Sequence, residues 1–385
     1  MKQPARRKKV AKASKARKAA RTLSVSKGLK SIKAAAAATP ATGPVTLDEA
    51  KALASARRPK LALRIAAKNV SPPASPAAVG AERKRLAQEQ RDERANRIRD
   101  YKATMDVMKK RGARRPRPKG SAKVAKAAKA DDPTTKGGAF APLQIFAEGD
   151  SWFDYPVPFF GGGIIPRLEE RLGVPILNLA KAGDEVRYML GVEERAELTR
   201  QLTDGCPAGG PWDVLLFSGG GNDIVDNPMA LWIKDWNPAV PPASHIHQTR
   251  FAAALALVRA GYEDLITLRN QLSPETHLVF QGYDFAIPDG RGICFLGPWL
   301  QPTFQLRKFP PGPAAQQVVR AMLEQFAAML QSLAQPKVTF INGQGTLTPQ
   351  KSSWHNELHP AKAGFEQFAN LFHRELRKLF PNRVA

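Results

Sequence analysis

The sequence has little of what marks a secreted or membrane-embedded chain. It contains 2 cysteines, Cys206 and Cys294, in 385 residues, which excludes a fold held together by several disulfides. No apolar run approaches the roughly 20 residues that a membrane-spanning helix needs. The chain starts with a basic stretch, but the nearest candidate for the apolar part of a secretory signal is AAAAATPATG, which has no cluster of Leu, Val or Phe. The sequence therefore predicts a cytoplasmic protein without a transmembrane segment.

Acidic residues are scarce in the first part of the chain. Residues 1–140 hold 38 Lys and Arg but 10 Asp and Glu, whereas the remaining 245 residues hold 21 basic and 24 acidic residues. The net charge of +25 therefore comes from residues 1–140, where large apolar side chains are too few to offset the entropy of ordering. We expect residues 1–140 to form a largely disordered extension rich in Lys, Ala, Arg and Pro, and residues 141–385 to form one folded domain.

Two segments of this extension carry helix signals. Thr46 followed by Glu49 has the spacing of a capping box. Farther along, an apolar stripe recurs at helical spacing, formed by Ile98, Tyr101, Met105 and Met108. We expect marginal helices at both places.

The basic extension also suggests a partner. Clustered Lys and Arg attract nucleic acid or an anionic surface without sequence preference, because binding releases counterions. Neither the Cys/His spacing of a zinc finger nor the aromatic signature of an RNA-recognition domain is present. A solubilising or tethering tail is therefore an equal alternative to nucleic-acid binding.

Residues 141–385 alternate short apolar runs with amphipathic segments. The runs LQIFAEGDS, VPILNLA, WDVLLFSGG, HLVFQGY and KVTFING are typical of buried parallel strands. Helices are predicted between them, the clearest over residues Arg250–Leu272, Ala314–Leu333 and Pro360–Leu379. Strands separated by helices require right-handed crossovers, so we predict a three-layer α/β/α fold with a five-stranded parallel sheet.

Polar residues suited to acyl transfer follow these runs. In parallel sheets the reactive crevice lies beyond the carboxyl ends of the strands, where Ser151, Gly183, Asn222 and His359 are expected. A serine, a glycine amide, an asparagine amide and a histidine are the groups that acyl transfer uses. Taken alone, Gly149-Asp150-Ser151 is an ordinary turn, Gly220-Gly221-Asn222-Asp223 an ordinary loop and His359-Pro360 an ordinary helix start.

Taken in order, these motifs resemble the SGNH hydrolases, also called GDSL esterases and lipases, over residues 143–380. Gly149-Asp150-Ser151 matches the first motif of that family, with Trp152 where Leu is common. The resemblance implies a serine ester hydrolase with a flavodoxin-like sheet, in which Ser151 is the nucleophile and His359 the general base. It also implies an oxyanion hole formed by Ser151, Gly183 and the side chain of Asn222.

One position departs from the family pattern. Asn356 stands where the family usually has an Asp that orients the histidine. In serine proteases the corresponding Asp-to-Asn change costs roughly 10⁴ in turnover, largely through the wrong tautomer. An Asn oxygen can accept the same hydrogen bond if its amide faces the right way. The orienting group is therefore Asn356, Glu357 or a backbone carbonyl, and we favour Asn356. The alternative is a domain that Asn356 leaves weakly active or inactive, in a protein that binds nucleic acid or an anionic surface through its basic extension.

A cofactor is not expected. His355 and His359 are four residues apart with Glu357 between them, but Pro360 disfavours a helix at this motif and no third zinc ligand is evident. The run FFGGGII lacks the Lys-Ser/Thr of a phosphate-binding loop and is read as an ordinary loop.

Substrate choice is expected to come from two long connections, residues 225–248 and 284–312, and from Trp152, Phe153 and Tyr155 beside the nucleophile. Such aromatic residues are typical of an apolar or sugar-stacking pocket, and equally of packing under a long insertion. The predicted substrate is a small-molecule, carbohydrate or lipid ester.

Overall fold

Five parallel strands form the centre of the computed structural model, which describes residues 43–56, 76–114, 141–155, 161–293 and 297–384. The strands are β1 (Ile145–Gly149), β2 (Ile176–Asn178), β3 (Val214–Ser218), β4 (His277–Gln281) and β5 (Val338–Ile341). They lie in the order β2-β1-β3-β4-β5, with Ile145 of β1 opposite Ile176 of β2 and Val214 of β3. The predicted flavodoxin-like sheet is confirmed, and each of the five apolar runs contributes one strand.

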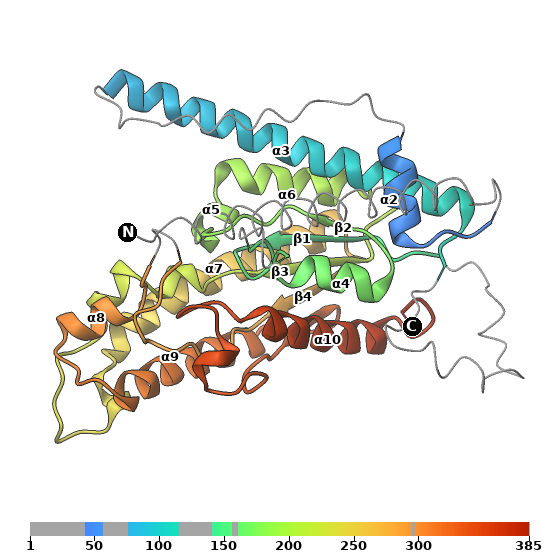
Figure 1. Cartoon of the computed structure of the whole chain (residues 1–385). Coiled ribbons are helices and arrows are strands. Elements are labelled where there is room, and N and C mark those ends of the chain that lie inside the picture. Colours follow the sequence, from blue (N-terminus) through green and yellow to red (C-terminus); the bar gives the residue numbers. More distant parts are fainter. Residues whose placement is uncertain (1–42, 57–75, 115–140, 156–160, 294–296, 385) are drawn as a thin grey trace, which may run out of the picture. The chain divides into compact units, whose positions relative to one another are not determined.

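Helices cover both faces of this sheet (Figure 1). On one face α4 (Ile164–Leu172) packs against α10 (Lys362–Leu379). On the other, α7 (Gln248–Leu272) contacts α5 (Val186–Met189), α6 (Val192–Asp204) and α9 (Pro313–Gln331). The connections also contain α8 (Gln301–Leu306) and the 3-10 helices η3 (Asn222–Ile224), η4 (Asn227–Leu231), η5 (Pro242–His245) and η6 (Lys351–Ser353).

Burial on both faces explains why the strands read as continuous apolar runs. Every residue of β1 and β3 is buried, as expected for a parallel sheet between two helical layers. The three predicted helices are confirmed to within two residues at each end. The last one, α10, starts at Lys362 because Pro360 pairs with Trp354 in an isolated bridge.

Two helices precede the sheet in the chain, α2 (Leu47–Ala56) and α3 (Pro76–Arg111). The capping box is confirmed, since the Thr46 amide donates to Glu49 Oε2 at 2.8 Å and the Glu49 amide donates to Thr46 Oγ1 at 3.3 Å. In α3, Tyr101, Met105 and Met108 of the predicted stripe are buried in the same apolar core as the sheet, with Ile98 partly buried against it. The ring of Tyr101 lies 5.4 Å from that of Trp212.

This packing divides the chain at a different point from the expected boundary after residue 140. By contacts, residues 44–385 form one compact unit, so α2 and α3 pack in the same unit as the sheet. The sequence could not reveal this, because the partner of the α3 stripe is Trp212, more than 100 residues away. Residues 1–140 were expected to be largely disordered with marginal helices, whereas α3 is a helix of 36 residues. The ranges 1–42, 57–75 and 115–140 lie outside the described residues.

No helix in the described ranges is long and apolar enough to cross a membrane. Cys206 is a buried free thiol, and Cys294 lies outside the described residues. The cytoplasmic location stays a prediction.

Candidate active site

Ser151 lies in the turn that follows β1, at the carboxyl edge of the sheet. The turn is closed by amides of Phe153 and Asp154, each of which donates to the Asp150 carbonyl at 3.1 Å. Gly149 precedes it because β1 and β3 approach closely there: a Cβ at this position would lie 2.5 Å from the carbonyl oxygen of Ser218. A larger residue at this position would push β1 and β3 apart and displace Ser151.

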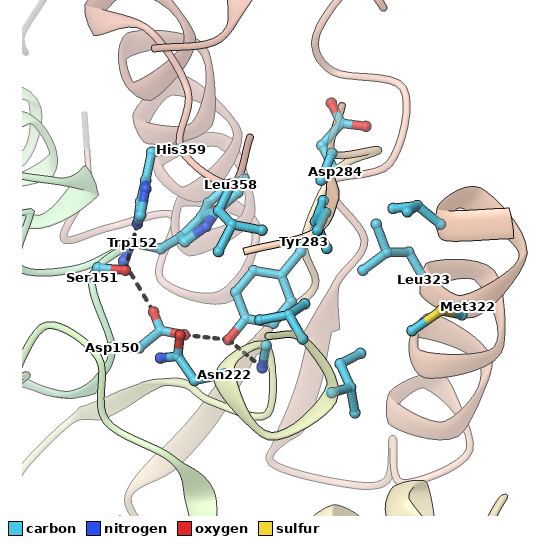
Figure 2. A pocket seen from close by; sticks show the side chains of 16 residues that line it. Asp150, Ser151, Trp152, Asn222, Tyr283, Asp284, Met322, Leu323, Leu358 and His359 are labelled. Atoms are coloured by element: carbon cyan, nitrogen blue, oxygen red, sulfur yellow. Dashed lines mark hydrogen bonds between the residues drawn. The ribbon is translucent and has the colours of Figure 1, made fainter. Parts of the chain in front are cut away.

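Two residues from opposite ends of the domain meet at this turn. Ser151 Oγ lies 2.6 Å from His359 Nε2, as Figure 2 shows, and both side chains are buried. Burial, and then the charge of nearby His355, lower the pKa of His359 to about 3. A neutral imidazole at pH 7 can accept the hydroxyl proton, which is the requirement for a general base.

Asn356 holds the other side of the imidazole. Its Oδ1 lies 3.0 Å from His359 Nδ1 and also accepts the amides of Leu358 and His359, both at 2.9 Å. Turning the carboxamide over would place its NH₂ group against two N–H donors in a fully buried site. Its Nδ2 instead donates to the Tyr155 hydroxyl at 3.1 Å. The oxygen therefore faces the imidazole, which places the hydrogen on Nδ1 and leaves Nε2 free to accept.

The carboxyl group of Asp150 stabilises the turn that carries Ser151 through hydrogen bonds. Its Oδ1 accepts the Trp152 amide at 3.0 Å and the Ser218 hydroxyl at 3.1 Å, and its Oδ2 accepts a short hydrogen bond from Tyr283 (Figure 2). Burial raises the pKa of this carboxyl group to about 6 in spite of these donors. The sequence reasoning assigned no role to Asp150 or Tyr283, although Asp150 stands inside the Gly-Asp-Ser motif.

Asn222 and Gly183 follow two other strands of the sheet, β3 and β2. Asn222, at the start of η3, lines the same pocket as Ser151 and His359, and its Nδ2 donates to the Asp184 carbonyl at 2.8 Å. Gly183 is exposed and has φ +81°, a conformation that favours glycine. In the part of the chain that the structure describes, the amides of Ser151 and Gly183 donate to no other protein group.

A narrow pocket of about 40 Å³ opens beside Ser151 and His359 (Figure 2). Most of its lining is apolar, including Ile224, Leu300, Val319, Met322, Leu323 and Leu358. Val225 and Leu300 come from the two long connections that were expected to shape the substrate site. A mostly apolar lining suits a hydrocarbon group better than a polar one.

A model of the GDSL-like Lipase/Acylhydrolase family matches residues 149–367. The chain belongs to this family. The recognition made from the four motifs is confirmed, and the protein is a hydrolase of the GDSL type with the α/β/α fold of that group. The match begins at Gly149 and therefore leaves α2 and α3 outside.

Several solved structures of lipases and esterases match part of this chain. A lipase from a goat rumen metagenome is 16% identical, with 60% of this chain and 96% of that chain covered and a TM-score of 0.40. An extracellular lipase from Streptomyces rimosus is also 16% identical (60% and 99% covered, TM-score 0.38). A family 3 carbohydrate esterase from Clostridium thermocellum is 14% identical (64% and 100% covered, TM-score 0.35). No curated protein matches the sequence.

Glu357, the second candidate for orienting the histidine of this GDSL-like hydrolase, has different partners. It is fully buried, and its oxygens accept four backbone amides, those of Gly290, Trp299, Leu300 and Gln301, at 2.6–3.0 Å. Its carboxylate thus fixes the connection that supplies Leu300 to the pocket. Neither the spacing nor the motif of Glu357 signals this, because its partners lie more than 50 residues earlier.

The histidine pair and the Gly-rich loop bind protein groups in this structure. His355 Nδ1 lies 2.6 Å from the Tyr155 hydroxyl, and no cluster of three or more His, Cys, Asp or Glu suited to a metal occurs among the described residues. In the Gly-rich loop, the carbonyls of Gly161, Gly162 and Gly163 converge on Arg167 Nη1. Carbonyl oxygens turned inward repel a phosphate rather than bind it.

The aromatic residues after the nucleophile have different roles. Phe153 is fully buried, with its ring 5.9 Å from that of Phe372, and belongs to the core. Trp152 lines the pocket and packs edge-on against Phe368 at 4.9 Å. The Tyr155 ring lies 4.5 Å from that of His359 and covers the imidazole. All three are buried, which leaves none of them as an open platform for a sugar.

Proposed function

We propose that this GDSL-like hydrolase cleaves esters with an apolar acyl group through an acyl-enzyme on Ser151. The observation that carries the proposal is the 2.6 Å contact between Ser151 Oγ and the Nε2 of a neutral His359 whose Nδ1 is held by Asn356. His359 removes the hydroxyl proton as Ser151 attacks the ester carbonyl, and Asn356 keeps the imidazole in the required tautomer.

The oxyanion is expected to meet three donors, the backbone amides of Ser151 and Gly183 and the side chain of Asn222. The two amides have no competing acceptor within the described part of the protein, and the Asp184 carbonyl occupies one hydrogen of the Asn222 amide while the other is available. His359 then gives its proton to the departing alcohol. Water activated by the same imidazole attacks the acyl-enzyme, which releases the acid and restores Ser151.

The acyl preference follows from the pocket beside the serine. Its lining of Ile, Leu, Val and Met side chains and its volume of about 40 Å³ favour a short hydrocarbon chain over a polar or branched group. The proposed substrate is therefore a small-molecule ester with an unbranched, apolar acyl group.

The test combines covalent labelling with turnover. A fluorophosphonate should add once to the full chain, read by intact mass, and should not add to Ser151→Ala or His359→Ala. The same preparations are assayed with p-nitrophenyl acetate, butyrate and octanoate. Labelling that persists in Ser151→Ala would place the nucleophile elsewhere and refute the proposal. A preference for acetate would refute the acyl assignment alone.

The basic residues of the chain support a second, independent proposal, which is that residues 1–140 bind nucleic acid or an anionic surface without sequence preference. The excess of 28 positive charges in that stretch is the observation behind it. Binding of double-stranded DNA by the full chain should weaken steeply with salt. Binding that does not change with salt would contradict a counterion-release mechanism.

A further inference from the structure

Arg97 of α3 contacts two segments of the active-site region. Its Nη1 donates to the carbonyls of Asn178 and Ala180, both at 3.1 Å, and its Nη2 pairs with Asp154 Oδ2 at 2.7 Å. Asn178 and Ala180 begin the loop after β2, residues 178–185, which we call the Gly183 loop. Asp154 closes the turn that carries Ser151. One planar guanidinium thus ties the nucleophile turn to the Gly183 loop.

Arg94, one turn earlier on the same helix, reaches the far end of this loop. Its Nη2 lies 3.2 Å from Glu194 Oε1, and Glu194 interacts directly with the side chain of Asp184. Asp184 Oδ2 and Glu194 Oε2 are both buried without a hydrogen-bond partner among the described residues, so a proton shared between the two carboxyl groups would satisfy both oxygens. Burial and the neighbouring carboxylate raise the pKa of Asp184, which keeps that proton in place.

The far end of the Gly183 loop is in turn connected to Asn222. The carbonyl of Asp184 is the group that accepts the Asn222 Nδ2 hydrogen bond. The loop between the two arginine contacts therefore carries one expected oxyanion donor, Gly183, and orients a second, Asn222. A shift of this loop would move both donors relative to Ser151.

We infer that Arg97 and Arg94 of α3 are positioning residues that hold the Gly183 loop in register with Ser151, so that α3 is part of the catalytic apparatus. This inference rests on the proposed function, because it assigns the loop to the oxyanion hole. Helix α3 suits the role, since Tyr101, Met105 and Met108 anchor it in the core of the domain. It also lies outside residues 149–367, the part that the family model covers.

The experiment compares Arg97→Ala with Arg91→Ala in the full chain. Arg91 is the matched control, because it is exposed on the same helix and bonds only to Gln88 among the described residues. For p-nitrophenyl butyrate we expect kcat of Arg97→Ala to fall by about 10- to 100-fold with KM unchanged, since the misplaced donors act on the transition state. Fluorophosphonate titration counts the folded sites and corrects kcat for any loss of folded protein.

Chemical rescue distinguishes a positioning role of Arg97 from a purely structural one. A cleft of about 460 Å³, lined by Arg97, Tyr101 and Asp154 among others, opens beside the guanidinium. Millimolar guanidinium should enter the vacated position and raise kcat of Arg97→Ala, and it should leave the Arg91→Ala control unchanged. If Arg97→Ala does not fold, Arg97→Lys replaces it. We expect kcat to fall in Arg97→Lys because an ammonium cannot reach both carbonyls and Asp154, but to fall less than in Arg97→Ala because the positive charge is kept.

Ser151→Ala, assayed in parallel, separates the two proposals. Hydrolysis that persists in Ser151→Ala refutes the proposed function. If Ser151→Ala is inactive while the Arg97 variant has the kcat of the Arg91 control, the inference about α3 is wrong and the proposed function stands. A loss confined to KM, or a loss of kcat that guanidinium does not restore, likewise overturns the positioning role.

Discussion

The side-chain oxygen of Asn356 lies 3.0 Å from Nδ1 of His359, in the place that a carboxylate usually occupies in GDSL-type hydrolases. The two backbone amides on the same oxygen and the Tyr155 hydroxyl on Nδ2 prevent the carboxamide from turning over. Asn356 thus fixes the tautomer as an Asp would, but it supplies no negative charge to stabilise an imidazolium. The consequence is an active site whose base has the correct geometry and a low basicity.

Asn356→Asp should therefore raise the pKa of His359 from about 3 towards the ordinary histidine value. The base acts when neutral, so the acid limb of kcat/KM should move to higher pH in the variant, whereas the unmodified protein keeps its activity to lower pH. At pH 8 His359 is neutral in both proteins. We expect kcat of Asn356→Asp to exceed that of the unmodified protein by about 10- to 100-fold, because the new carboxylate stabilises the imidazolium that forms during attack. A pH–rate profile measures both effects, and identical profiles would contradict this account of Asn356.

Glu357→Gln should destabilise the domain. The carboxylate accepts four backbone amides, and a carboxamide would turn an NH₂ group towards two of these donors. We expect the free energy of unfolding, measured with urea, to fall by about 1–3 kcal/mol. Glu275→Gln is the control, since Glu275 is exposed and, within the described ranges, pairs only with Lys337 on the surface. Equal free energies for the two variants would show that Glu357 does not hold the connection.

Met322→Ala should shift the acyl preference towards longer chains. Met322 lines the pocket from α9, and removing its side chain extends the apolar space beside Ser151. Each additional buried methylene contributes about 0.8 kcal/mol, or about fourfold in kcat/KM. Hexanoate has two more methylenes than butyrate, so the ratio of kcat/KM for hexanoate over butyrate should rise by about 15-fold in Met322→Ala. Met329→Ala, on the same helix but outside the pocket lining, should keep the original ratio; a parallel change would mean that the pocket does not bind the acyl chain.

Glu148→Gln should change how stability depends on pH. Glu148 is fully buried, and burial raises its pKa from 4.5 to about 8. Glu148 therefore ionises at a lower pH in the unfolded chain than in the folded protein. The contribution of Glu148 to stability is lost as the pH rises from about 4.5 to about 8. The variant lacks this loss, so its Tm should exceed that of the unmodified protein at pH 8 by about 2–4 °C for each kcal/mol, with the difference shrinking towards pH 5. A Tm difference that is constant with pH would rule out ionisation of Glu148 as the cause.

Local patterns in the sequence determined the sheet and the reactive pair. Each of the five strands is a continuous apolar run because both faces of a parallel sheet are covered, and this property is visible in one dimension. Parallel strands also end at a common edge, so Ser151, Asn222 and His359 could be placed together from their positions after the runs. The capping box at Thr46 is equally local, since both partners lie within one helical turn.

Only the tertiary structure decided how these groups are supported. Tyr155 accepts the hydrogen bond of the Asn356 Nδ2 group, and the carboxylate of Glu357 accepts amides near Leu300. The Gly183 loop is bonded to Arg97 of a helix that the sequence predicted only as a marginal helix in a largely disordered extension. In each case the partners are separated by more than 50 residues. Periodicity and composition describe the surroundings of a residue along the chain, whereas hydrogen bonds between distant segments exist only once the core has brought them together.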